Sequence, residues 1–341
     1  MNSRRVRPSR IAALALACAM MLTGCAGGGA SDATGGASAS TKSGTALNVY
    51  AFSVAKPAFD ALGQGYAASG GGTVQASYGP SGDQSRKVAA GAPADVVAFS
   101  LAPDVTRLVT AGLVASDWNA GTLHGTPFGS VVVMVVRKGN PKGIKDWPDL
   151  LASGVSVVTP NPLSSGSAQW NLLAPYAAAS DGGKNPAAGL AYVSSLVKDH
   201  IHSQPASAAE ASESFRQGTG DVLLSYENEA IAAIKAGEAV EYVVPHQTFK
   251  IENAVAVVSK SSHPDAARAF VAYVESPSGQ EAVARAGYRP ADASVLAAHP
   301  EFVQPAKLWT IADLGGWPAV TASLFDKSTG AITQLYSKVT G

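Results

Sequence analysis

The sequence predicts an α/β protein built as two lobes, each with a mainly parallel sheet flanked by helices. Two observations predict this class. Short apolar runs alternate with segments of helical periodicity along most of the chain, which is the pattern of βαβ units. The pattern occurs in two successive sets, joined by continuous apolar runs such as residues 130–137, "SVVVMVVR", which are typical of strands buried on both faces. A cleft between two such lobes is a natural place for a ligand.

The first set of elements extends from residue 47 to residue 111. Apolar and β-branched residues predict strands at 47–51, 74–78 and 94–99. Helical spacing predicts helices at 57–66, 84–90 and 103–111. In the first of these helices Phe59, Leu62 and Tyr66 fall on one face, so that face should pack against the sheet.

The second set begins with the apolar run at 130–137. Strands are predicted at 155–158, 221–225 and 241–244, with helices at 168–179 and 187–197. A further strand at 254–258 and helices at 264–275 and 279–286 follow. The chain shows no internal sequence repeat, so the two sets are expected to share an architecture without sharing a sequence.

The N-terminus carries the most specific local signal. Four arginines between residues 4 and 10 precede an apolar run at 11–22 that ends in "LTGC" (22–25). The run is too short for a transmembrane helix, and Leu-x-Gly-Cys is typical of a bacterial lipobox. Residues 1–24 are therefore predicted to be a lipoprotein signal peptide, with Cys25 as the lipid attachment site. The alternative is an ordinary signal peptide with a chance cysteine.

Composition indicates a flexible linker, the absence of a nucleic-acid partner and the absence of a disulfide. The Gly/Ser/Ala-rich segment 25–45 is predicted to be a flexible linker. Twenty-five basic residues balance 25 acidic ones, so no nucleic-acid partner is expected. Cys18 lies within the predicted signal peptide, which leaves Cys25 alone in the mature chain and predicts no disulfide.

Three stretches share one design, in which small hydroxyl or glycine residues stand between a preceding extended segment and a helix. They are "GPSGDQ" (79–84), "PLSSGSA" (162–168) and "QPASAAE" (204–210). The first N–H groups of a helix have no intrahelical partner and lie at the positive end of its dipole, so several such starts together would bind an anion. The alternative is plain N-capping by serine.

An enzyme is the competing class. The segment Gly79-Pro80-Ser81-Gly82-Asp83 lacks the final glycine of a hydrolase nucleophile elbow. The six histidines are scattered, and His200 and His202 are expected at the surface. No nucleophile, base and metal set emerges, so neither catalysis nor a cofactor or metal is expected. Tyr226, at the end of a predicted strand, is either a ligand donor or a packing aromatic.

Several longer stretches carry a family resemblance. They include residues 78–100, "YGPSGDQSRKVAAGAPADVVAFS", residues 220–230, "GDVLLSYENEA", and residues 307–317, "KLWTIADLGGW". The chain resembles, over roughly 47–341, the periplasmic sulfate- and thiosulfate-binding proteins of ABC importers, most of all their actinobacterial lipoprotein form. The resemblance implies a two-lobed periplasmic-binding-protein fold of the second class. Its expected divisions are 46–128 (lobe 1), 129–251 (lobe 2), 252–310 (return to lobe 1) and 311–341 (a C-terminal segment packed across the lobes).

The resemblance also implies a set of ligand residues. In that family a desolvated sulfate is held by N–H groups and hydroxyls at helix starts. The positions that match the family's contacts are Ser53, Ser81, Ser165, Gly166, Ser167, Ser207 and Tyr226. Ser167 replaces a family glycine, Tyr226 replaces a tryptophan of the enterobacterial relatives, and Phe52-Ser53 stands where those relatives have Asp-Pro.

The expected ligand is therefore sulfate, delivered to the permease subunits of an ABC importer by a monomeric receptor. The receptor is expected to be anchored by lipid to the outer face of the cytoplasmic membrane. Sulfate carries no proton and needs donors only, whereas hydrogen phosphate also needs an acceptor, and Asp83 is the residue that would supply one. Thiosulfate, phosphate or molybdate receptors of the same fold, a tethered serine hydrolase and a structural envelope protein remain the alternatives.

Overall fold

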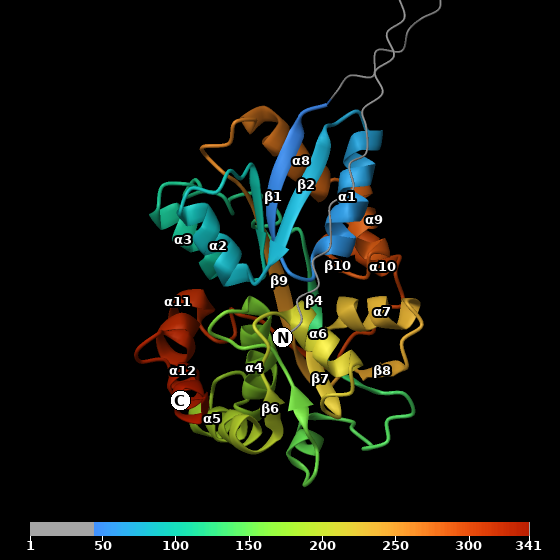
Figure 1. The fold of residues 1–341 in the computed structure, drawn as a ribbon, viewed down its shortest axis with the longest axis vertical. Helices are drawn as coiled ribbons and strands as arrows, with labels where there is room; N and C mark the ends of the chain where they lie inside the picture. Colours follow the sequence, from blue (N-terminus) through green and yellow to red (C-terminus); the bar gives the residue numbers. More distant parts are fainter. Residues whose placement is uncertain (1–43, 341) are drawn as a thin grey trace, which may run out of the picture. The chain divides into compact units, whose positions relative to one another are not determined.

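The computed structural model describes residues 44–340 (Figure 1). The predicted signal peptide, the lipid site at Cys25 and nearly all of the predicted linker lie outside the described residues. Within the described range, no helix combines the length and the apolarity needed to cross a membrane. The described chain forms one compact unit whose elements gather in two groups.

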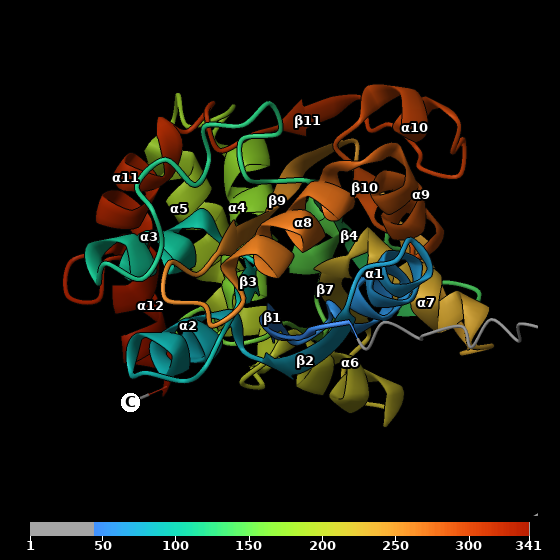
Figure 2. The same ribbon diagram turned by 90° about the horizontal axis from the view of Figure 1, so that it is seen from above.

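The first group builds a parallel sheet from the strands that the sequence predicts. β1 pairs in parallel with both β2 and β3. Helices α2 and α3 lie on one side of these strands and α1 and α9 on the other (Figure 2). Phe59, Leu62 and Tyr66 are buried on α1, which confirms the predicted face. The elements of this group are β1 (Ala46–Phe52), α1 (Lys56–Ala68), β2 (Thr73–Gly79), α2 (Ser81–Ala89), β3 (Val96–Phe99), α3 (Ala102–Thr110), α8 (Pro264–Glu275), α9 (Pro277–Arg285), β10 (Arg289–Pro290) and α10 (Ala293–Ala297).

The second group repeats the plan, with β5 paired in parallel to β6 and β7. Its elements are η1 (Trp147–Leu151), β5 (Val157–Val158), α4 (Gly166–Ala179), α5 (Pro186–Ser195), η2 (Leu196–His200), β6 (Ile201–Ser203), α6 (Ala208–Arg216), β7 (Val222–Tyr226), α7 (Glu227–Lys235) and β8 (Val240–Val243). The C-terminal elements β11 (Lys307–Trp309), α11 (Gly316–Val320), η3 (Thr321–Phe325) and α12 (Ala331–Thr340) pack here as well, with α12 beside α5.

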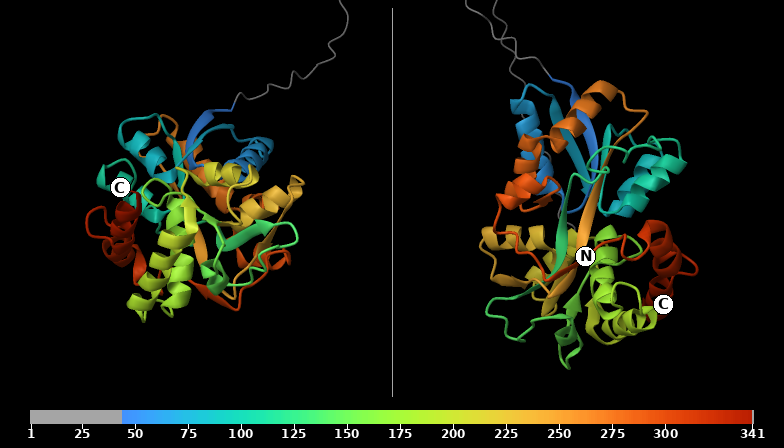
Figure 3. Two further views of the ribbon diagram at one scale, coloured as in Figure 1. Left: turned by 60° about the horizontal axis from the view of Figure 1, so that its bottom comes forward. Right: turned by 180° about the vertical axis from the view of Figure 1, so that it is seen from behind.

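Two long strands join the groups, β4 (Phe128–Arg137) and β9 (Gln247–Val257). They run side by side between the two groups (Figure 3, right). One end of β9 pairs antiparallel with β3 and its middle with β4, while β4 continues to β7, so the strand order is β2-β1-β3-β9-β4-β7-β5-β6. The carboxyl ends of β1, β2 and β3 therefore meet the second group at this junction, where α/β sheets place their ligands.

Most predicted boundaries lie within one or two residues of the observed ones, and three differences stand out. The helix predicted at 84–90 begins at Ser81, because Pro80 supplies the non-helical cap conformation and leaves Ser81 free to start the helix. The strand predicted at 254–258 begins at Gln247, since the charged Lys250 and Glu252 alternate with apolar residues and hide its first half. The helix predicted at 187–197 changes at Leu196 to a π-helical turn.

Candidate anion-binding site

The start of α2 offers backbone donors, and its serine side chain is already in use. The helical hydrogen bonds begin with Gln84 N–H to Pro80 O at 2.9 Å, so the N–H groups of Ser81, Gly82 and Asp83 precede them. The buried Ser81 hydroxyl donates to Asp104 Oδ2 at 2.7 Å and accepts from Ser100 N–H at 3.1 Å. The part of Ser81 that is open to a ligand is therefore its N–H group.

The start of α4 has the same form. Ser165 occupies the N-cap position without making a side-chain capping bond, and its own N–H donates to Asn161 O at 2.9 Å. The first helical bond runs from Ala168 N–H to Ser165 O at 3.2 Å, so the N–H groups of Gly166 and Ser167 precede it. Both Ser165 and Ser167 are 3% exposed. The helix thus presents free donors inside the protein.

The structure brings these two helix starts together at the end of β3. A Cβ atom on Gly82 would lie 3.3 Å from Ser164 O, and one on Gly166 would lie 2.7 Å from Ser100 Cβ. Only glycine at 166 lets α4 approach β3 this closely. The indole of Trp170 fixes the approach, because its Nε1–H donates to Ser100 O at 2.8 Å.

Two buried hydroxyls face this junction, those of Ser100 and Tyr226. Neither makes a hydrogen bond of regular geometry with another described residue. Tyr226 ends β7 and is 1% exposed, with its ring 6.5 Å from that of Phe52. Burial raises the pKa of the Tyr226 phenol, and the neighbouring hydroxyls of Ser167 and Ser100 oppose that rise. Tyr226 is therefore a neutral donor at physiological pH, beside Ser167 at the start of α4 and beside Ser100 at the end of β3.

Ser207 and Ser53 occupy different positions from the group above. Ser207 caps α6 by accepting from Glu210 N–H at 3.2 Å. This is the N-capping role that the sequence analysis gave as the alternative to anion binding. The start of α6 is nonetheless beside the loop before α4, because Ser164 Oγ donates to Ala206 O at 2.8 Å. Ser53 lines a separate cavity of about 370 Å³ together with Ser212, Asn228 and Glu229.

Both carboxylates near the start of α2 are paired with protein donors. Asp83 is 42% exposed and forms an ion pair with Arg86, so it stabilises the helix start from the solvent side. Asp104 accepts from Arg107 at 2.9 Å as well as from Ser81. Both arginines, together with Gly82, line a cavity of about 580 Å³ that reaches Ser165 and Gly166.

Sequence reasoning missed Ser100, Asp104 and Trp170. The signal for Ser100 was present, since "SLAP" (100–103) follows a predicted strand and opens a helix, as the three recognised stretches do. Asp104 and Trp170 act through contacts with distant parts of the chain, which no local pattern indicates. One prediction was wrong: His200 is buried at 9% exposure, with Nδ1 3.0 Å from Val155 O, whereas His202 is exposed.

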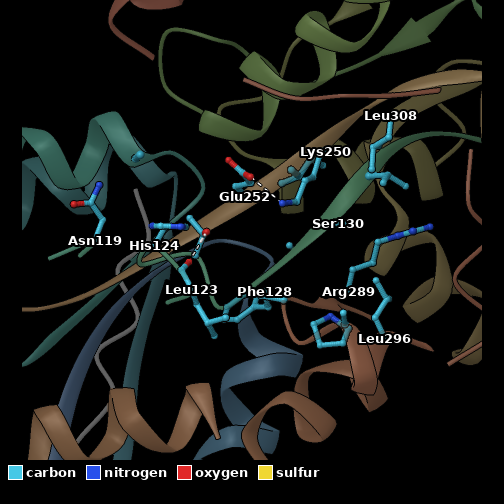
Figure 4. Close-up of a pocket in the computed structure, with 18 of the residues that line it drawn as sticks. Asn119, Leu123, His124, Phe128, Ser130, Lys250, Glu252, Arg289, Leu296 and Leu308 are labelled. Carbon is cyan, nitrogen blue, oxygen red and sulfur yellow. Dashed lines mark hydrogen bonds and ion pairs between the residues drawn. The ribbon is translucent and has the colours of Figure 1, made fainter. Parts of the chain in front are cut away.

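Another cavity, about 570 Å³, lies along the crossing strands and is lined in part by Ser130 and Leu308 (Figure 4). Its charged side chains are engaged with one another or elsewhere. Lys250 pairs with Glu252 at 3.0 Å, and the guanidinium of Arg289 points away from them to the buried Glu227. Main-chain donors without a helical partner stand instead at the starts of α2 and α4, so among the described residues these helix starts form the better candidate site.

Comparisons with known proteins identify the family of the chain. The model of the bacterial extracellular solute-binding protein family matches residues 47–289. A sulfate-binding protein of Synechococcus elongatus is 38% identical over 260 residues, covering 73% of each chain. A thiosulfate-binding protein of Pseudomonas aeruginosa is 34% identical over 274 residues, 78% of this chain and 82% of that protein.

The solved structure of the sulfate-binding protein SubI from Mycobacterium tuberculosis H37Rv is similar in fold as well as in sequence. It is 54% identical, with a TM-score of 0.81, and the match covers 83% of this chain and all of that chain (100%). This likeness confirms the predicted periplasmic-binding-protein fold. The chain belongs to the bacterial extracellular solute-binding protein family.

Proposed function

We propose that this protein is the receptor of an ABC importer and that it captures sulfate, with thiosulfate as the second candidate. The proposal rests on one observation above the others: the starts of α2 and α4 meet at the end of β3, where the hydroxyls of Ser100 and Tyr226 make no hydrogen bond of regular geometry with the described residues. Helix starts and hydroxyls supply donors without a cation, which suits an anion that has lost its hydration shell. The sulfate- and thiosulfate-binding relatives support the same ligand class.

The choice of sulfate over hydrogen phosphate follows from proton chemistry. Hydrogen phosphate would need an acceptor for its proton, whereas sulfate would leave a free carboxylate unpaired and repelled. Asp83 is held at the surface by Arg86, and both oxygens of Asp104 accept from protein donors. The two carboxylates near the α2 start are thus occupied, which favours the unprotonated dianion.

Capture would proceed by closure of two lobes, 46–128 with 252–310 and 129–251, around the anion. Ser81 and Ser100 belong to the first lobe, while Ser165, Gly166 and Tyr226 belong to the second, so a ligand that touches both would favour the closed form. The closed receptor would then dock on the permease subunits.

The family is described as extracellular, in agreement with the predicted export signal. We further propose that a lipid on Cys25 tethers the mature chain to the outer face of the membrane. Cys25→Ala should move the protein from the membrane fraction to the medium after cell fractionation, whereas Cys18→Ala should not. Equal release of both variants would contradict the anchor.

Calorimetric titration of the mature domain with sulfate, thiosulfate, phosphate and molybdate tests the ligand. Sulfate or thiosulfate should bind in the micromolar range or tighter, and phosphate binding without sulfate binding would refute the proposal. Ser165→Asp places a negative charge at the start of α4 and should weaken sulfate binding more than about 100-fold. Ser276→Asp is the matched control, because it puts the same charge at the start of α9, where Ser276 caps the helix. Its affinity should stay within about twofold of wild type.

A further inference from the structure

Asn253 on β9 is a fully buried carboxamide without a partner. It is 0% exposed, and neither Nδ2 nor Oδ1 forms a hydrogen bond with the described residues. Gln280, another amide at 0% exposure, shows the usual situation. Its Nε2 donates to Pro127 O at 2.8 Å and to Val274 O at 3.0 Å, while its Oε1 accepts from Asp292 N–H at 3.0 Å. A buried amide that lacks all such bonds is costly, so Asn253 requires a partner from outside these residues.

The register of the sheet places Asn253 beside the candidate site. β3 and β9 pair Ala98 with Val255 and Phe99 with Ala254, so the next position in this register sets Ser100 opposite Asn253. Directly opposite residues of an antiparallel pair lie on the same face, with Cβ atoms roughly 5 Å apart. Ser100 is the residue whose Cβ lies against Gly166 and whose hydroxyl is also unpartnered.

On its other side, Asn253 pairs with a residue that has no polar side-chain atom and so cannot form a hydrogen bond with the amide. On β4 its partner is Phe128, whose ring packs 5.3 Å from Tyr288. The hydroxyl of Tyr288 is used elsewhere, since it donates to Val54 O at 2.7 Å. This aromatic wall continues through Phe52 to Tyr226. A hydrogen-bond partner for the Asn253 amide must therefore lie on the side of Ser100.

We infer that Asn253 is a ligand-contacting residue of the anion site, a role that rests on the proposed function. Its Nδ2 carries two hydrogens: one is donated to an oxygen of the bound anion and the other to Ser100 Oγ, so the hydroxyl hydrogen of Ser100 stays available to the anion. The amide gives the site a side-chain donor from the strand that runs between the two groups of elements. The anion is then held by helix starts and by a crossing strand together.

Asn253→Leu tests this role because it keeps the size of the side chain and removes its polar atoms. In calorimetry with sulfate, Kd should rise roughly 10-fold or more, the effect of losing one hydrogen bond to a charged group. The melting temperature of the ligand-free variant should be unchanged or higher, because a buried unpartnered amide has been removed. The rise in melting temperature on adding sulfate should shrink accordingly.

Thr248→Val is the matched control on the same strand. The buried Thr248 hydroxyl donates to Val132 O at 2.6 Å, so its loss should lower the melting temperature and leave Kd within about twofold. Asn253→Asp is a second variant of unchanged size. It replaces the donor by a negative charge and should weaken sulfate binding about 100-fold at neutral pH.

The outcomes separate the two proposals. If wild type binds sulfate and either Asn253 variant keeps the wild-type Kd within twofold, the amide is satisfied by a buried water or by packing, and the inference is wrong. If wild type binds none of the four anions, the proposed function itself fails. A parallel loss of affinity in Thr248→Val would also overturn the inference, because the effect would then come from the strand and not from the amide.

Discussion

Replacing Arg289 by methionine should lower the free energy of unfolding by about 3–5 kcal/mol. Arg289 Nε donates to Glu227 Oε2 at 2.6 Å, Nη2 donates to Oε1 at 3.0 Å, and Nη2 also reaches Val303 O at 2.6 Å. Glu227 is 0% exposed, so the variant would leave a carboxylate buried without its counter-charge. Two hydrogen bonds to a charged group, at about 1.5–3 kcal/mol each, give a loss of the same size.

The loss should depend on pH. Burial raises the pKa of Glu227, and the hydrogen bonds and charge of Arg289 oppose that rise. Without Arg289 the folded-state pKa rises further, so the variant is least destabilised where Glu227 is protonated in both states. Its stability then falls as pH increases from about 4.5, the ordinary value, through the raised pKa. The deficit relative to wild type should be larger at pH 8 than at pH 5.

Urea unfolding followed by circular dichroism measures these differences. Arg285→Met is the matched control, because Arg285 pairs with Glu281 at the surface and should contribute less than about 1 kcal/mol. In the double variant Glu227→Leu/Arg289→Met, no charge stays buried, so part of the stability should return. A loss below 1 kcal/mol for Arg289→Met, or a double variant no better than the single one, would refute the reasoning.

Three further predictions follow from single contacts. Ser207→Ala should cost about 1 kcal/mol in urea unfolding by removing the α6 cap, whereas Ser165→Ala, which removes no side-chain cap, should cost less; equal losses would contradict this. Burial raises the pKa of Glu229, so wild type should lose stability relative to Glu229→Gln as pH rises from about 4.5, and a pH-independent difference would argue against it. Tyr226→Phe should leave the ligand-free melting temperature unchanged and weaken sulfate binding roughly 10-fold, measured by calorimetry; a lower melting temperature with unchanged affinity would make Tyr226 a packing residue.

Local periodicity was sufficient to predict the helices with one apolar face and the strands made of a continuous apolar run. The helix at 264–275 has its predicted bounds, and the buried run at 130–137 makes up all of β4 except its first two residues. It failed where charge interrupts the pattern, as in the first half of β9, whose Lys250 and Glu252 point away from the core. Pro80 likewise hid the start of α2, since the sequence does not say whether proline precedes or enters the helix.

The site was predictable only where its groups are main-chain donors. A helix start is a local feature, so the segments around Ser81 and Ser165 could be recognised from short motifs. Ser100 and Asn253 are 153 positions apart, and only the pairing of β3 with β9 makes them neighbours. The alternative roles of Ser207 and Tyr226 could not be separated from sequence either, because capping and ligand binding call for the same residue types.

The hydrogen bond from Trp170 to Ser100 O gives the protein an optical reporter of its own. Trp170 is 0% exposed and packs 5.7 Å from Phe249 and 4.9 Å from Trp317. Any motion that withdraws α4 from the end of β3 must break this bond and bring water to the indole, which would shift its emission to longer wavelength. Because the other four tryptophans do not make this contact, the difference spectrum between wild type and Trp170→Phe isolates the signal. Opening and closing of the junction could thus be followed in unlabelled protein, on the timescale of the motion itself.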